Sequence, residues 1–120
     1  MRPISAEIVN KLNSTGLGEP IHYVGLGAHD FQFAFGDFNV RSENKVIFTI
    51  AAARYEWTEG PIEAPVWTLV GLKVVGVEST SGETLKFTLS SGNEIEAWTD
   101  DSQYEAVIVE AKVHGILEVF

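Results

Sequence analysis

The chain has 120 residues, of which 45% are hydrophobic and 21% charged, a balance that suits one folded domain and excludes a disordered chain. It contains no cysteine, so disulfides, iron–sulfur clusters, cysteine-ligated zinc and thiol nucleophiles are excluded. Its 17 acidic and 8 basic residues give a formal charge of −9, which disfavours binding to nucleic acids and to anionic membrane surfaces.

The first predicted element is a short amphipathic helix over residues 4–12. Ile4, Ile8 and Leu12 recur at helical spacing and would form one apolar face. The polar residues that follow should end the helix. Gly16 is expected to close it in the left-handed conformation, which glycine adopts more easily than other residues.

From residue 21 onward, alternating apolar and polar residues predict strands almost throughout the chain. Strands are expected at residues 31–35, 46–50, 72–77, 85–89, 94–98, 106–110 and 116–120. The inward side chains of these strands should form the core, and we expect it to include Phe33, Phe35, Phe48, Val75, Val77, Leu85, Phe87, Leu89 and Ile95.

A different composition separates the chain into two halves. Residues 57–65 contain two prolines, a glycine and two glutamates, which predicts a linking loop. The halves resemble each other, because residues 31–40 align with residues 85–95 when one residue is inserted in the turn. A Gly-Leu pair precedes each aligned segment, at Gly25-Leu26 and at Gly71-Leu72.

These patterns predict an α+β fold that is mainly antiparallel β. We expect a single domain over residues 1–120, with a pseudo-repeat of two β-meanders at residues 20–56 and 66–120. The meanders should pack as a sandwich or an open roll, with one short N-terminal helix.

Residues 69–110 carry a pattern that resembles a known group of proteins. A Leu-x-Gly strand begins at Leu69, a strand and a Ser-Gly turn follow at residues 85–92, and Tyr104-Glu105-Ala106 comes next. This order resembles small bacterial domains of unknown function, several of which are encoded beside polymorphic toxin genes as immunity proteins. The resemblance implies an immunity protein of contact-dependent growth inhibition, and the group offers no catalytic motif to transfer.

Candidate catalytic and metal-binding groups are few. The histidines, His22, His29 and His114, do not have the spacing of a metal site and are interpreted as strand-end or loop residues. Gly25 and Gly27 lack the third glycine of a dinucleotide-binding fingerprint, so a strand bend is expected there. We therefore expect no catalytic residue, no metal and no cofactor.

Two acidic segments with tryptophan are the candidate partner-binding residues. If Ile95 and Ala97 point inward, then Glu94, Glu96 and Trp98 point outward together. Tryptophan is enriched at interface hot spots, although Trp98 could instead pack under the N-terminal helix or a loop, and the acids could serve only solubility. The predicted partner-binding residues are Glu56, Trp57, Glu59 and Glu63 in the mid-chain loop, with Glu94, Glu96, Trp98, Asp100 and Asp101 beside the last hairpin.

The sequence thus favours a non-catalytic, acidic immunity protein that binds and neutralises a cognate protein toxin. A nuclease toxin has a basic cleft because it binds a polyanion, and an acidic inhibitor can approach such a cleft quickly. The alternative is a small-ligand-binding β protein or an uncharacterised enzyme, since seven phenylalanines could line a pocket inside a barrel. The N-terminus lacks the apolar stretch of a signal peptide, so a cytoplasmic location is expected.

Overall fold

The computed structural model describes residues 4–58, 62–80, 82–99, 107–111, 113 and 115–120. Within these residues the chain forms one α-helix, α1 (Ala6–Thr15), and two short 3-10 helices, η1 (Val66–Leu69) and η2 (Ser90–Gly92). The strands are β1 (Ile21–Leu26), β2 (Phe31–Phe35), β3 (Phe38–Ser42), β4 (Val46–Ile50), β5 (Ala53–Trp57), β6 (Val74–Glu78), β7 (Thr84–Leu89), β8 (Glu94–Trp98), β9 (Val107–Ala111) and β10 (Ile116–Val119).

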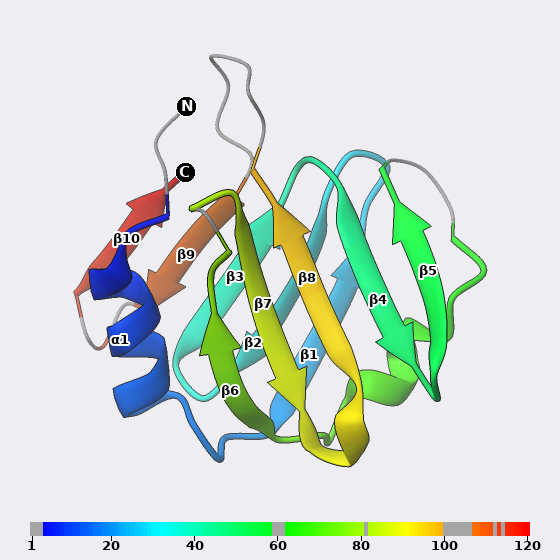
Figure 1. Ribbon diagram of the computed structural model, residues 1–120, viewed down its shortest axis with the longest axis horizontal. Helices are drawn as coiled ribbons and strands as arrows, with labels where there is room; N and C mark the ends of the chain where they lie inside the picture. Colours follow the sequence, from blue (N-terminus) through cyan, green and yellow to red (C-terminus); the bar gives the residue numbers. More distant parts are fainter. Residues whose placement is uncertain (1–3, 59–61, 81, 100–106, 112, 114) are drawn as a thin grey trace.

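The strands form two antiparallel sheets of five that pack face to face (Figure 1). Sheet 1 has the order β1-β2-β3-β9-β10, and sheet 2 has the order β5-β4-β8-β7-β6. Helix α1 lies beside β6 at one side of the sandwich. The predicted fold class, α+β with a mainly antiparallel sandwich and one N-terminal helix, is confirmed.

The two predicted halves do not each form one sheet, which corrects the simple picture of two packed meanders at residues 20–56 and 66–120. The β4–β5 hairpin belongs to the first half but joins sheet 2, where β4 pairs with β8. The β9–β10 hairpin belongs to the second half but joins sheet 1, where β9 pairs with β3. Alternation along a strand reports which side chains face inward, and it carries no information on the pairing partner.

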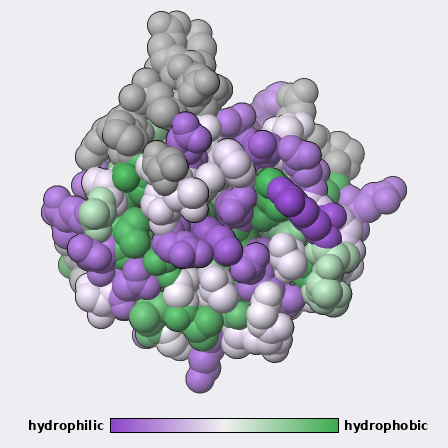
Figure 2. Space-filling view, in the orientation of Figure 1, coloured by the Kyte–Doolittle hydropathy of each residue, from purple (hydrophilic) through white to green (hydrophobic). Residues whose placement is uncertain are grey.

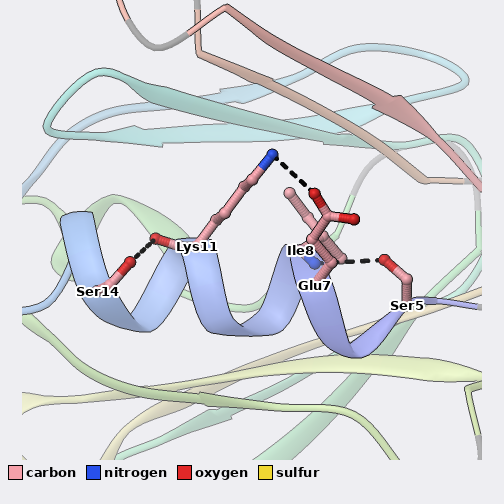
Figure 3. A network of polar contacts seen from close by, with 5 residues as sticks. All are labelled: Ser5, Glu7, Ile8, Lys11 and Ser14. Atoms are coloured by element: carbon pink, nitrogen blue, oxygen red, sulfur yellow. Dashed lines mark hydrogen bonds and ion pairs between the residues drawn. The ribbon is translucent and has the colours of Figure 1, made fainter.

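Helix α1 begins two residues later than predicted and extends further. The Ser5 side chain caps it by accepting a hydrogen bond from the Ile8 N–H at 3.3 Å, and the Glu7–Lys11 ion pair spans the first turns at 3.1 Å (Figure 3). Gly16 has a φ of −105°, so the left-handed cap predicted there is wrong. Glycine is required at this position for another reason, since a Cβ would lie 2.6 Å from the Phe35 ring.

Phenylalanine rings from both sheets meet in the core. Phe33 of sheet 1 and Phe87 of sheet 2 pack edge to face with centroids 4.9 Å apart. Eight of the nine predicted core residues are buried, and the exception is Val75, which is 52% exposed. A register shift between Val74 and Gly76 forms a β-bulge, so Val74 points inward in place of its neighbour.

Candidate partner-binding surface

The outward side chains of β8 form the centre of the candidate surface. Ile95 and Ala97 are buried in the core, while Glu94, Glu96 and Trp98 are half-buried on the opposite side. The alternation predicted for this strand is therefore confirmed. We call the outer surface formed by Glu56, Lys86, Glu94, Glu96 and Trp98 the β8 face, and Figure 2 shows that hydrophilic side chains cover much of this side of sheet 2.

Trp98 is held in a defined orientation on the β8 face. Its indole N–H donates a hydrogen bond to Glu96 Oε1 at 2.7 Å. The Lys45 ammonium lies 4.2 Å from the centroid of the ring, in a cation–π contact. Glu96 lies on β8 and Lys45 lies just before β4, so both contacts hold Trp98 on the outer surface of sheet 2. The alternative was that Trp98 packs under α1.

The carboxylates around Trp98 are arranged by cross-strand pairing. Glu56 on β5 and Glu96 on β8 both lie opposite Ile47 on β4, so the three residues form one row across the sheet. Ile47 points outward, yet it is only 6% exposed. Lys45 Nζ lies 3.8 Å from Glu56 Oε1, so the same ammonium contacts both Glu56 and Trp98.

Lys86 organises the other end of the β8 face. Its Nζ lies 3.2 Å from Glu94 Oε2 and 3.5 Å from Glu78 Oε1. The hydrogen bond to Glu94, with further attraction from both carboxylates, raises the pKa of Lys86 above its ordinary value of 10.5, against a smaller opposing effect of burial. The ammonium therefore bridges Glu78 and Glu94.

A shallow hollow opens between the two glutamates of β8. It has a volume of about 130 Å³ and is lined by Ile47, Thr49, Arg54, Glu94 and Glu96. This volume exceeds that of a few water molecules, at roughly 30 Å³ each. The lining of the hollow combines one apolar side chain with four polar or charged ones.

The structure corrects the prediction for Trp57. This residue ends β5, pairs with Val46 and is only 2% exposed, so it belongs to the core and cannot act as a surface anchor. Its neighbour Glu56 points to the opposite side and joins the β8 face. Glu63 is exposed in the segment before η1, outside the strands that form the β8 face.

The remaining predicted partner-binding residues, Glu59, Asp100 and Asp101, lie outside the described residues. The structure thus brings together Glu56, Glu94, Glu96 and Trp98 from the nine that were predicted. The sequence analysis missed Lys45 and Lys86, which position these side chains. The outward parity of Lys86 on its alternating strand could have revealed it, whereas Lys45 precedes β4 and offered no such signal.

Trp67, which was not predicted as a site, is 68% exposed. It lies on η1, whose four residues have no strand alternation from which exposure could have been inferred.

The histidines give no metal centre in the part of the chain that is described, where no group of three potential ligands is close enough to hold an ion. His22 Nε2 lies 3.0 Å from the Gly36 carbonyl oxygen, at the rim of a hollow of about 310 Å³ on sheet 1. His29 is exposed in the turn after β1, and His114 lies outside the described residues. Gly25 lies within β1, and Gly27 begins the turn that follows this strand.

Searches with protein-family models, curated protein sequences and solved structures found no match to this chain. Among the residues with described positions, no helix has the length and apolar character needed to cross a membrane.

Proposed function

We propose that this chain is a non-catalytic binding protein of the immunity type, which neutralises a basic protein toxin by docking the β8 face onto it. One observation carries the proposal. Trp98 lies on an outer sheet surface, oriented by Glu96 and accompanied by Glu56 and Glu94, in a chain with a formal charge of −9.

The chemistry of this surface suits a cationic partner. A tryptophan at an interface supplies a large contact area, and oriented aromatic residues often contribute most of the binding free energy. The surrounding carboxylates attract a basic cleft and favour one docking orientation. Lys45 lies over the Trp98 ring in a cation–π contact, which is the type of contact that a basic group of a partner would make with an indole.

The packing of the core favours a binding surface over an internal ligand site. Phe31, Phe33 and Phe35 of sheet 1 contact Phe48 and Phe87 of sheet 2 at centroid distances between 4.8 and 5.7 Å. These rings occupy the space in which a small ligand between the sheets would have to lie. We propose a cytoplasmic location, because a nuclease toxin meets its substrate there.

The proposal predicts that a polypeptide encoded directly upstream of this chain carries a basic toxin domain, and that domain is the binding partner used in the test. The purified chain should inhibit that domain at a 1:1 ratio, and Trp98→Ala should weaken the complex by about 2 kcal/mol or more, mainly through faster dissociation. Surface plasmon resonance measures both rates.

Trp67→Ala is the matched control, because Trp67 is 68% exposed and lies on η1 away from β8. It should leave the affinity unchanged. Undiminished affinity in Trp98→Ala, or a loss of affinity in Trp67→Ala alone, would show that the β8 face is not the docking surface.

A further inference from the structure

We infer that the chain consists of two interchangeable copies of one structural unit, which exchange their C-terminal hairpins. The first unit is β1 to β5, and the second is β6 to β10. Each unit begins with a three-stranded meander and ends with a hairpin that crosses to the other sheet, where β4 joins β8 and β9 joins β3. Each sheet therefore contains one meander and the hairpin of the other unit.

The strand registers agree between the two units, residue by residue. The central row of sheet 1 joins Val24, Phe33, Val40 and Val109, and the corresponding row of sheet 2 joins Val77, Phe87, Ile95 and Phe48. Phe33 corresponds to Phe87, and Val40 corresponds to Ile95, so the β7–β8 connection is one residue longer than the β2–β3 connection. This difference is the single inserted residue that the sequence alignment required.

The segments that enter the two meanders are joined by hydrogen bonds in equivalent pairs. In the first pair, Gly18 N–H donates to the Val74 carbonyl oxygen at 2.8 Å, and Gly71 N–H donates to the Ile21 carbonyl oxygen at 2.7 Å. In the second pair, Val74 N–H donates to the Glu19 carbonyl oxygen at 3.0 Å, and Ile21 N–H donates to the Leu72 carbonyl oxygen at 2.8 Å. If Gly18, Glu19 and Ile21 are replaced by their equivalents Gly71, Leu72 and Val74, and the reverse, each bond becomes the other bond of its pair. A local two-fold axis therefore passes between these segments.

Backbone irregularities recur at the same places in both units. Gly18 has a φ of +84° and Gly71 a φ of +95°, so both occupy the left-handed region in the same position before the first strand. Each first strand then has a register shift after its first residue, which is Ile21 in β1 and Val74 in β6. The partner of Gly71 is thus Gly18, and the sequence alignment of Gly71 with Gly25 was wrong.

Packing around the axis follows the same symmetry. Phe33 and Phe87, which are equivalent, contact each other directly across the sandwich. Helix α1 precedes β1 and packs on β6, whereas η1 precedes β6 and packs on β1, at opposite sides of the molecule (Figure 1). Trp57 and Phe120 are also equivalent, because Trp57 lies opposite Val46 and Phe120 bonds to Val107. This equivalence explains why Trp57 is buried.

At equivalent positions, the two units have similar residues on their inner faces but different residues on their outer faces. Glu94, Glu96 and Trp98 on β8 correspond to Asn39, Arg41 and Glu43 at the end of the β2–β3 hairpin. Since the same backbone accepts both sets, the fold does not dictate the tryptophan and the carboxylates of the β8 face. The binding role of these side chains rests on the proposed function. The structural equivalence of the two units is independent of it.

A circular permutation of the full chain tests the interchange of the units. The original ends are joined by a flexible glycine–serine linker, and the chain is opened between Ile62 and Glu63, which reverses the order of the intact units. The two covalent crossovers between the sheets, β3 to β4 and β8 to β9, are both retained. This permutant should unfold cooperatively in urea, with a midpoint close to that of the parent chain and the same circular dichroism spectrum.

The control permutant carries the same linker but is opened between Glu43 and Asn44, which separates the first meander from its hairpin. Only one covalent crossover then joins the two sheets. The effective concentration of each sheet at the other therefore falls, and the urea midpoint should decrease. Loss of cooperative unfolding in the first permutant, or a midpoint at or below that of the control, would overturn the inference. Neither measurement involves the toxin, so this result is independent of the proposed function.

Discussion

At the residue scale, the β8 face depends on two lysines that hold its acidic and aromatic side chains in place. Lys45 contacts Trp98 and Glu56, and Lys86 contacts Glu94. Exposed ion pairs contribute little to stability, typically 0–1 kcal/mol. The main effect of these lysines is therefore on the positions of Trp98 and the glutamates of the β8 face.

The raised pKa of Lys86 makes one of these contacts measurable. A lysine whose pKa is higher in the folded than in the unfolded state stabilises the fold fully below the unfolded pKa, near 10.4, and this contribution disappears as the pH rises through the folded pKa. The melting temperatures of the parent and Lys86→Met should therefore differ at about pH 9 and converge at higher pH.

Thermal denaturation followed by circular dichroism checks this convergence, and Lys73→Met is the control. Lys73 is an exposed lysine just before β6, so Lys73→Met controls for the loss of one positive surface charge. A parent–variant difference for Lys86 that stays constant or grows above pH 10.5 would contradict the raised pKa.

At the scale of elements, the strands predicted at residues 31–35, 46–50, 85–89 and 94–98 match β2, β4, β7 and β8 to within one residue, whereas no strand was specified at β1, β3 or β5. The β7–β8 connection contains Ser91 and Gly92, both with positive φ, and the hairpin was predicted correctly. The β4–β5 turn consists of Ala51 and Ala52, with φ of +52° and +68°. That region is disfavoured for alanine, so two alanines carry no signal for a turn, and β5 and the burial of Trp57 were missed.

The same turn predicts a stabilising substitution. A non-glycine residue in the left-handed region costs about 1 kcal/mol or more. Glycine removes that cost, and the gain exceeds the smaller destabilisation that comes from the higher entropy of the unfolded chain. Ala52→Gly should therefore raise the free energy of unfolding by about 0.5–1 kcal/mol in urea titrations.

Ala53→Gly, at the first residue of β5, serves as the control and should lower the free energy of unfolding, since glycine loses more backbone freedom than alanine when it folds into an extended strand. If Ala52→Gly were as destabilising as Ala53→Gly, the positive φ at Ala52 would not be a source of strain.

At the scale of the whole molecule, the sequence predicted the layers but not the connections between them. Alternation identified most of the inner face of sheet 2 but only Phe33 and Phe35 of sheet 1, and the resemblance between residues 31–40 and 85–95 reflects the equivalence of Phe33 and Phe87. The pairings of β3 with β9 and of β4 with β8 join distant segments, and no local pattern specifies such a partner. The position of Glu56 beside Glu96 depends on that exchange.

The most direct test of the proposed function is the salt dependence of association with the upstream-encoded toxin domain. Association rate constants are measured by surface plasmon resonance at low and at physiological ionic strength. The comparison includes the parent chain, Glu94→Gln/Glu96→Gln on the β8 face, and the control Glu7→Gln/Glu43→Gln, which removes the same charge elsewhere.

If the β8 face attracts the toxin, association of the parent will slow as salt is added, because screening weakens long-range attraction. The Glu94→Gln/Glu96→Gln variant will associate more slowly at low salt and with a flatter salt dependence, and the Glu7→Gln/Glu43→Gln control will stay close to the parent. An association rate that is independent of salt, or equal rates for the two double variants, would contradict the proposed role of the β8 face.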